Sequence, residues 1–252
     1  MLSAELLEFA RSPGAYLDAT GTEVVDNDRY FAAIVAGGKY VNVFRPSFAL
    51  NDAAEILAEV RALAPSATGS WQTDSRDLAD ALVAAGARRP APPLEFEFVA
   101  LATATAPPAV DGIDVRRVES FDDYLVGLEI ALSAEQYTDE VRARRRAEAE
   151  ATWERRRSGP AMEWLASIDG EPVAHARAFP GPRGFLLDGG ATTPSARGHG
   201  AYRALIAARW HEAVARGTPA LVVQAGEMSR PILERCGFEV VCTMYEAEHD
   251  PL

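Results

Sequence analysis

Apolar residues recur along this chain with two different periods, which predicts a protein built from both helices and strands. In the segment that ends at Arg216, their spacings of three and four residues define one buried helix face. This face comprises Tyr202, Leu205, Ile206, Trp210, Ala213 and Val214. Gly217 and Pro219 follow and indicate where the helix ends. The segment 185–192 and the short apolar run at 220–224, which contains β-branched residues, predict strands on either side of it, so the expected fold class is α/β.

Residues 1–105 show a similar alternation of elements. Helices are expected at 2–9, after Asp52 and at 77–85, with strands at 22–25, 30–35, 40–44, 70–73 and 94–101. Asp52 and Glu55 have the spacing of a capping box, so we expect Asp52 to cap the second helix. One face of this helix is expected to hold Ile56, Leu57, Val60 and Leu63.

Two helices and a hairpin are expected between residues 113 and 181. A strand at 113–118 precedes a helix capped by Ser120, and Thr138 is expected to cap one further helix that runs to about Arg157. This second helix is rich in arginine and glutamate, which is typical of a solvated helix with ion pairs. Asp169-Gly170 between two apolar runs predicts a β-hairpin.

The two parts of the chain share a motif that indicates a degenerate internal repeat. Ser75-Arg76-Asp77-Leu78, ending at Gly86, resembles Ser229-Arg230-Pro231-Ile232, ending at Gly237. Chance remains the alternative, because strand–helix–strand units are common. We therefore expect domains at 1–105 and 112–252, joined by a proline-containing linker at 106–111.

Composition narrows the classes of function. The 252 residues carry a formal net charge of −12, which argues against a nucleic-acid surface and suits a cationic acceptor such as an amine. Cys236 and Cys242 are expected to be reduced, as in the cytoplasm. The first residues do not resemble a signal peptide, and no apolar run is long enough to span a membrane.

A glycine-rich turn between the strand at 185–192 and the following helix is the strongest functional signal. Its sequence is Arg197-Gly198-His199-Gly200-Ala201-Tyr202. Free backbone N–H groups and the helix dipole would favour an anion here, most often a phosphate. A dinucleotide fingerprint would need a small residue where Arg203 stands, and a Walker loop would need Gly-Lys-Ser/Thr. A turn that only caps the helix is the simplest alternative.

This turn resembles the acyl-CoA loop, R/Q-x-x-G-x-G/A, of the GCN5-related N-acetyltransferases (GNAT), with Tyr202 in the last small position. The segment 225–238, which ends in Gly237-Phe238, resembles the second half of the same core, so the resemblance covers about 112–252. It implies a GNAT fold, a mixed sheet flanked by helices, in two GNAT-like halves of which the first lacks the CoA loop. It also implies direct transfer of an acetyl group from acetyl-CoA to an amine of a small molecule or peptide in a ternary complex, without a metal.

The resemblance assigns cofactor contacts to two segments. Gly190, Ala191 and Thr192 would pair with the pantetheine arm through their backbone. The pyrophosphate would lie on Gly198, His199, Gly200, Ala201, Tyr202 and Arg203. The side chain of Arg197 or Arg203 would also meet a phosphate.

Two catalytic assignments are weaker. Asp188 shares its strand face with Gly190 and is our candidate general base, while Leu186 stands where relatives carry a glutamate. Three alternatives stay open. Glu163 would be the base, the proton would pass to a base through water, or Asp188 would only face the solvent at the end of its strand. Ser229 is the candidate to stabilise or protonate the thiolate, although it would also serve as a helix N-cap.

Leu233 and Gly226 replace a tyrosine and an asparagine that the family often has. This departure supports a second hypothesis, a non-catalytic acyl-CoA-binding sensor or scaffold. His175, His211 and His249 have no spacing typical of a metal site or a triad. We leave open whether the chain forms a homodimer.

Overall fold

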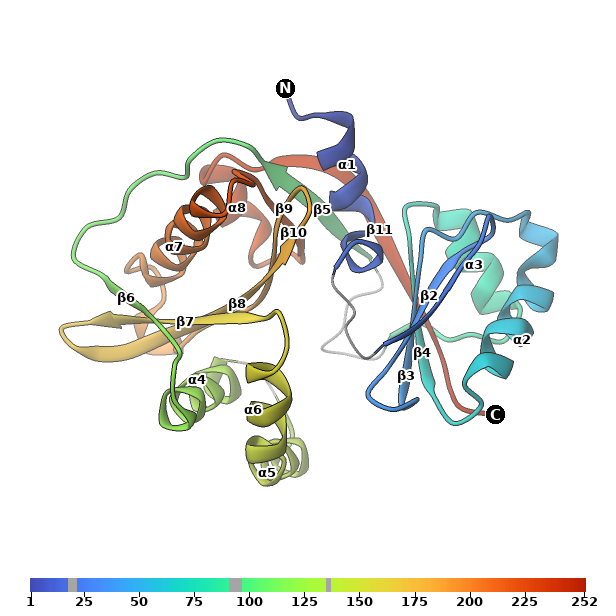
Figure 1. The fold of residues 1–252 in the computed structure, drawn as a ribbon, viewed down its shortest axis with the longest axis horizontal. Coiled ribbons are helices and arrows are strands. Elements are labelled where there is room, and N and C mark those ends of the chain that lie inside the picture. Colours follow the sequence, from blue (N-terminus) through green and yellow to red (C-terminus); the bar gives the residue numbers. More distant parts are fainter. Residues whose placement is uncertain (18–21, 91–96, 135–136) are drawn as a thin grey trace.

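The computed structural model describes residues 1–17, 22–90, 97–134 and 137–252, and these fold around one mixed sheet with helices on both faces (Figure 1). The strands are β1 (Glu23–Asp26), β2 (Phe31–Val35), β3 (Tyr40–Phe44), β4 (Thr68–Thr73), β5 (Glu97–Thr103), β6 (Asp114–Arg117), β7 (Met162–Ile168), β8 (Glu171–Gly181), β9 (Gly184–Thr192), β10 (Leu221–Ala225) and β11 (Glu239–His249). The helices are α1 (Ala4–Arg11), α2 (Ala53–Leu63), α3 (Arg76–Ala84), α4 (Phe121–Ala134), α5 (Asp139–Ala147), α6 (Ala149–Arg157), α7 (Ala201–Ala215) and α8 (Arg230–Arg235). The predicted α/β class is confirmed.

The last strand of each sequence half pairs with the other half. The strand order is β1-β2-β3-β4-β11-β5-β10-β9-β8-β7-β6, so β11 lies between β4 and β5, and β5 pairs with β10. The order β4-β3-β2-β1 beyond β11 corresponds to β10-β9-β8-β7 beyond β5, with β6 as an additional edge strand, and β3–β4 and β9–β10 are the parallel pairs. This arrangement fits the internal repeat. The segment 106–111 lies between β5 and β6. Strands from its two sides pair with one another in the sheet, and the division into domains at this segment stays a prediction.

Each half has its own hydrophobic core. In the N-terminal half, α2 buries Ile56, Leu57 and Val60 against Trp71 of β4, which alternates buried and half-buried positions as a strand covered on one face should. In the C-terminal half, α7 packs on one face of the sheet and α4 on the other. Successive side chains of β7 point to opposite faces, so Trp164 belongs to the hydrophobic core under α7 and Leu165 to the one under α4.

Most predicted elements are present, and the hairpin is formed as expected. Asp169 and Gly170 have φ values of 51° and 83°, as its two-residue turn requires. Val214, by contrast, is 47% exposed, because it lies at the edge of the apolar face of α7.

Two further details of the helices were predicted wrongly. Asp52 makes no capping hydrogen bond, because Leu50–Asp52 form a 3₁₀ turn that already gives Asp52 helical dihedrals. The segment after Thr138 forms two helices that meet at Glu148, and this break lets Ala149 of α6 become buried although α5 buries none of its residues.

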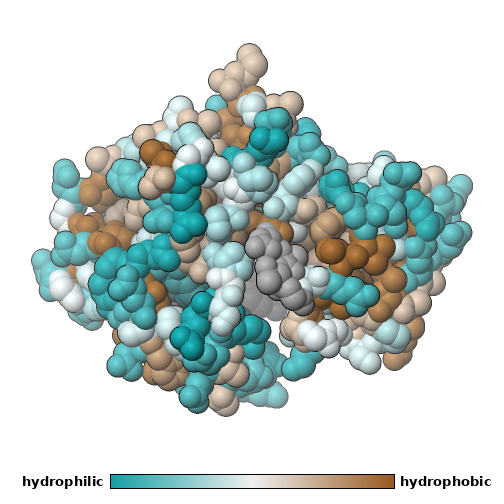
Figure 2. All heavy atoms as spheres, in the orientation of Figure 1, coloured by the Kyte–Doolittle hydropathy of each residue, from teal (hydrophilic) through white to brown (hydrophobic). Residues whose placement is uncertain are grey.

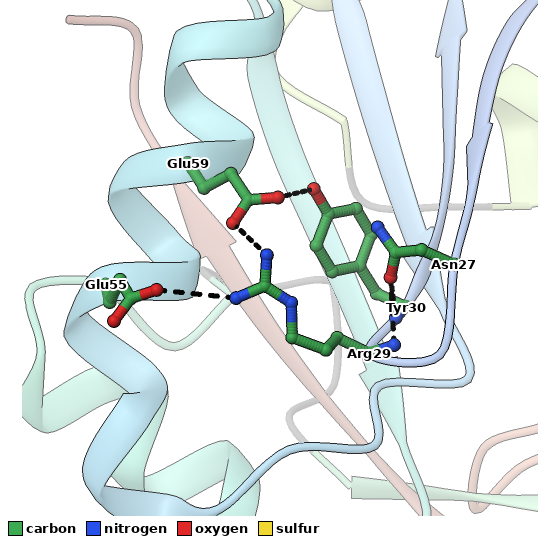
Figure 3. Close-up of polar contacts among 5 residues, drawn as sticks. All are labelled: Asn27, Arg29, Tyr30, Glu55 and Glu59. Carbon is green, nitrogen blue, oxygen red and sulfur yellow. Dashed lines mark hydrogen bonds and ion pairs between the residues drawn. The ribbon is translucent and has the colours of Figure 1, made fainter.

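A polar cluster joins the β1–β2 turn to α2 (Figure 3). Asn27 Oδ1 accepts hydrogen bonds from the backbone N–H groups of Arg29 and Tyr30 at 2.8 and 2.9 Å. Glu59 accepts from the Tyr30 hydroxyl at 2.6 Å and from Arg29, which also pairs with Glu55. Burial, aided by Glu59, raises the pKa of Tyr30 to about 12, so this hydroxyl stays a donor at ordinary pH.

Hydrophilic and apolar residues are distributed unevenly over the surface. Figure 2 shows mainly hydrophilic atoms over α4–α6 and a more apolar area over the strands of the N-terminal half. The arginine-rich α5 and α6 bury only Ala149 among their residues, as expected for solvated helices.

A buried pair attaches β11 to β4. Trp71 Nε1 donates to His249 Nδ1 at 2.9 Å, and Gly69 leaves the space that the His249 ring fills. The proton of the neutral ring is therefore on Nε2, which has no partner among the described residues. Burial, assisted by the charge of Arg61, lowers the pKa of His249 to about 4.

We predict an acid-dependent loss of stability from this histidine. Its contribution is complete above its ordinary pKa of 6.5 and falls as the pH drops towards 4, by about 2 to 3 kcal/mol. His249→Gln should flatten this part of the curve of unfolding free energy against pH, measured by urea denaturation. His211→Gln, at an exposed position, is the control and should leave the curve unchanged. Equal slopes in wild type and His249→Gln would contradict the assignment.

Candidate functional site

The two parallel strands β9 and β10 separate and form a wedge. They pair only between Phe185–Leu187 and Leu221–Val223, whereas the other edge of β10 is paired with β5 along its whole length. Beyond this apex, β9 continues with Asp188 to Thr192 while β10 turns away. An open wedge between parallel strands leaves backbone groups of β9 available to an extended ligand.

A β-bulge follows directly after the apex. Three residue steps on β9, from Asp188 to Ala191, oppose two on β8, from Arg177 to His175. Gly189 has a φ of 58°, and a Cβ there would lie 3.1 Å from Arg177 Nε. Because a bulge disrupts the ladder locally, this stretch can direct backbone N–H groups towards a bound carbonyl.

The glycine-rich loop joins β9 to α7. Gly198 and Gly200 have φ values of 84° and 96°, which residues other than glycine rarely adopt. The helix begins at Ala201, so its free N–H groups and positive dipole end face the loop. Arg197 Nη2 donates to the Ala134 carbonyl oxygen at the end of α4, at 2.8 Å, and so anchors the loop to the opposite helix layer.

A cavity of about 520 Å³ lies between this loop, the wedge and α8. It is lined by Pro108, Ala134, Gly190, Ala191, Thr192, Ala196, Arg197, Gly198, Gly200, Ala201, Tyr202, Arg203, Met228, Ser229, Ile232 and Arg235. The structure thus brings together every predicted cofactor residue except His199, which is exposed outside the cavity. Its volume is in the range of small-molecule and cofactor pockets.

The cavity is positively charged although the chain is acidic. Arg197, Arg203 and Arg235 line it, and no acidic residue stands among the described lining residues. This local charge suits an anionic ligand.

The linker also contributes to the cavity, which the sequence did not suggest. Pro108 lines it, and Val110 lies so close to the loop that a Cβ at Gly200 would be 3.1 Å from its Cγ1. Figure 1 shows this segment running from β5 past α8 and α7 to β6.

The two catalytic candidates differ in position. Ser229 lines the cavity, and its hydroxyl makes no capping bond to α8, only a long 3.5 Å contact with the Gly226 carbonyl. Asp188 lies outside the cavity, immediately past the apex of the wedge. Its carboxylate is 40% exposed and forms an ion pair with Arg177.

The N-terminal half has a parallel strand pair that corresponds to β9 and β10, but the cavity beside it has a different lining. There β3 and β4 pair in parallel only up to Val43 and Trp71, and a cavity of about 230 Å³ lies beyond. Glu8 and Asp74 line it together with Arg11 and Arg45. Without a glycine loop and with two carboxylates, it is poorly suited to a pyrophosphate.

One buried polar cluster lies between β7, β8 and the helices α4 and α6. Glu163 accepts from Arg156 Nη1 at 2.9 Å and lies 2.7 Å from His175 Nε2. The His175 ring occupies space that Gly127 of α4 leaves free. Burial alone would raise the pKa of Glu163, but the bond to His175 and the charge of Arg156 outweigh it, so the pKa is lowered. Glu163 is thus held as a paired structural carboxylate.

Sequence reasoning also missed Arg209. It is 1% exposed, donates from Nε to the Leu205 carbonyl and from Nη1 to the Arg177 carbonyl beside the bulge, and burial lowers its pKa to about 10. The signal was present, because Arg209 stands three and four residues after Ile206 and Leu205 on the buried face of α7.

Metal-binding groups and membrane-spanning helices were sought among the described residues. These residues contain no group of three or more histidine, cysteine or acidic residues arranged to hold a metal ion. Nor do they include a helix with both the length and the apolar composition to cross a bilayer.

Comparison with known proteins agrees with this geometry. The family described as "Acetyltransferase (GNAT) family" matches residues 128–238. A GCN5-related N-acetyltransferase from Kribbella flavida is 16% identical, with a TM-score of 0.66 over 98% of this chain and 96% of that chain. A functionally unknown conserved protein from Staphylococcus epidermidis ATCC 12228 is 12% identical, with a TM-score of 0.65 over 95% and 97%. A tandem GNAT protein from the clavulanic acid biosynthesis pathway is 16% identical, with a TM-score of 0.55 over 88% and 78%. No curated protein sequence is significantly similar.

The chain has the fold of solved GCN5-related N-acetyltransferases, and the glycine-rich loop lies within the segment that matches the family model. Residues 128–238 form a domain of the GNAT acetyltransferase family, and the whole chain shares the fold of the solved structures, one of which is a tandem protein. The predicted resemblance is therefore confirmed. Family and fold support an acyltransferase role, and members of this family typically bind acetyl-CoA.

The Glu163 cluster gives a prediction about stability. Glu163→Gln should lower the free energy of unfolding by about 3 kcal/mol, because the buried carboxylate would no longer make its charge-assisted hydrogen bonds to the buried His175 and the half-buried Arg156. Glu154→Gln, which breaks the exposed pair with Arg157, should cost about 0.5 kcal/mol or less. Chemical denaturation measures both, and equal losses would refute the structural role of Glu163.

Proposed function

We propose that the chain is an N-acetyltransferase that transfers an acetyl group from acetyl-CoA directly to an amine of a small molecule or peptide. The observation that carries this proposal is the cationic cavity at the open wedge, with a positive-φ glycine loop and a helix N-terminus at its mouth. When bound, acetyl-CoA supplies the activated acyl carbon. The residues of the chain hold it and orient the amine.

The loop and the wedge have separate tasks in this proposal. Backbone N–H groups of Gly198 to Arg203 bind the pyrophosphate, helped by the charge of Arg203 or Arg235. Gly190 to Thr192 pair with the pantetheine arm as an added strand. Running inward from the loop, the arm reaches the bulge, where backbone donors polarise the thioester carbonyl.

Asp188 is the proposed base. It follows the apex of the wedge but stands outside the cofactor cavity, where an amine approaching the thioester would meet it. The ammonium group loses a proton to Asp188 or to water, the amine nitrogen forms the new C–N bond with the acyl carbon, and the C–S bond breaks, so that CoA leaves as the thiolate. In this proposal Ser229, which lines the cavity, stabilises or protonates the departing thiolate. The two free cysteines fit a reducing cytoplasm.

A non-catalytic acyl-CoA sensor is the second candidate. Two observations favour it: Leu233 of α8 is fully buried and apolar, and the Asp188 carboxylate is already engaged by Arg177. Release of CoA in the presence of an amine panel separates the two functions, because a sensor binds acetyl-CoA without turnover.

Calorimetric titration with acetyl-CoA tests cofactor binding. We expect micromolar affinity for acetyl-CoA and none for NADH. Gly200→Glu places a carboxylate where the pyrophosphate should lie, so its affinity should fall at least about tenfold. Gly217→Glu is the matched control, since Gly217 also has a positive φ but lies at the far end of α7. Absence of acetyl-CoA binding to the folded wild type, or equal loss in both variants, would overturn the proposal.

A further inference from the structure

The cavity of the N-terminal half has a place in the sheet where ligands commonly bind. β3 and β4 are parallel, and the cavity lies beyond their last pair, Val43 and Trp71, at the carboxyl ends of the two strands. Open α/β sheets hold their ligands at this end of parallel strands. Because the described lining residues include no glycine, their side chains determine what the cavity can bind.

The lining of this cavity carries charges of both signs. Among its described residues, Arg11 and Arg45 are the cations, and Glu8 and Asp74 are the anions. The volume of about 230 Å³ corresponds to about eight water molecules by their share of liquid volume. The space therefore suits a ligand of the size of a small amino acid. The remaining described lining residues are Ser12, Pro46, Ser47, Gln72, Thr73 and Met244.

Two of the charged groups attract each other without a hydrogen bond between them. Arg11 Nε lies 3.7 Å from Asp74 Oδ2, which is longer than a hydrogen bond, and both side chains are about half-exposed. A loose pair of this kind adds little to stability. Both groups can therefore turn to a ligand in the cavity at small cost.

Arg45 is held at the cavity in an unfavourable backbone conformation. Its φ is 51°, which residues other than glycine rarely adopt, and the following Pro46 restricts it further. Nη2 donates to Asp26 Oδ1 at 2.8 Å, and the guanidinium lies 5.5 Å from the centre of the Phe31 ring. Such conformations persist where the surroundings fix them, and they cluster at ligand sites. The chain thus keeps a fixed cation at the cavity.

We propose that this cavity binds a free α-amino acid as its zwitterion. The ligand carboxylate bonds to the guanidinium of Arg45, and the ligand ammonium bonds to the carboxylate of Asp74. The carbonyl end of α1, which ends at Arg11 beside the cavity, also favours the ammonium. The acetyl-CoA cavity shares none of the described lining residues, so this inference goes beyond the proposed function.

Calorimetric titration of the full chain without acetyl-CoA tests the site, with the standard amino acids as probes. At least one small amino acid should bind with a Kd of about 1 mM or tighter. Its amide lacks the carboxylate, and its hydroxy acid analogue lacks the ammonium. Each analogue should bind at least about tenfold more weakly, because a hydrogen bond between charged groups is lost.

Two variants locate the binding groups. Asp74→Asn and Arg45→Gln each remove one charge and should lower the affinity at least about tenfold. Asp74→Asn should keep the melting temperature of the wild type, because its only ion pair is long and exposed. Arg183→Gln is the matched control, since Arg183 forms an exposed pair with Glu5 outside the cavity, and it should bind as the wild type does.

Asp188→Asn separates this site from the acceptor position of the proposed reaction, and it should leave the amino-acid affinity unchanged. If affinity is lost in Asp188→Asn but kept in Asp74→Asn, the amino acid binds as an acceptor and this inference is overturned. It is also overturned if no standard amino acid binds, or if the amide binds as tightly as the amino acid. Binding of acetyl-CoA is measured separately, so failure of the proposed function would leave this result unaffected.

Discussion

The whole site depends on how β10 is held between its two neighbours. β5 pairs with β10 over five residues, whereas β9 pairs with it over three. The stronger partner therefore determines the path of β10 and draws it away from β9 after Leu187. Because β5 comes from the first part of the chain, both parts of the sequence supply strands to the region around the wedge at which we place acetyl-CoA. The exchanged strand β11, fixed to β4 through His249 and Trp71, completes the same central region.

This dependence gives the N-terminal half a structural task. Its own parallel pair, β3 and β4, opens in the same way but lacks the glycine loop and carries carboxylates in its cavity. Loss of the loop removes the anion site, yet the half still supplies β5 and, through the linker, Pro108 and Val110 beside the loop. Degeneration of one site is compatible with retention of the fold, because sheet pairing and cofactor binding use different residues.

Features with a local cause were predictable from the sequence. The hairpin at Asp169-Gly170, the end of α7 at Gly217 and the loop at Gly198 and Gly200 each follow from backbone conformations that these residues favour. The exchange of β5 and β11 was not predictable, because pairing between distant strands leaves no periodic signal. Asp188 was placed on the correct strand, but its pairing with Arg177 depends on a bulge that shifts the register. Arg209 was not predicted to be buried, because a single charged residue within the apolar pattern of α7 does not by itself indicate a buried side chain.

We place one acetyl-CoA in the wedge of the C-terminal half. A crystal structure of the protein soaked with acetyl-CoA would show whether it binds there. We predict one cofactor per chain, with its pyrophosphate on the N–H groups of Gly198 to Arg203 and its pantetheine arm between β9 and β10. A cofactor bound beside β3 and β4, or an empty wedge at saturating acetyl-CoA, would contradict the account.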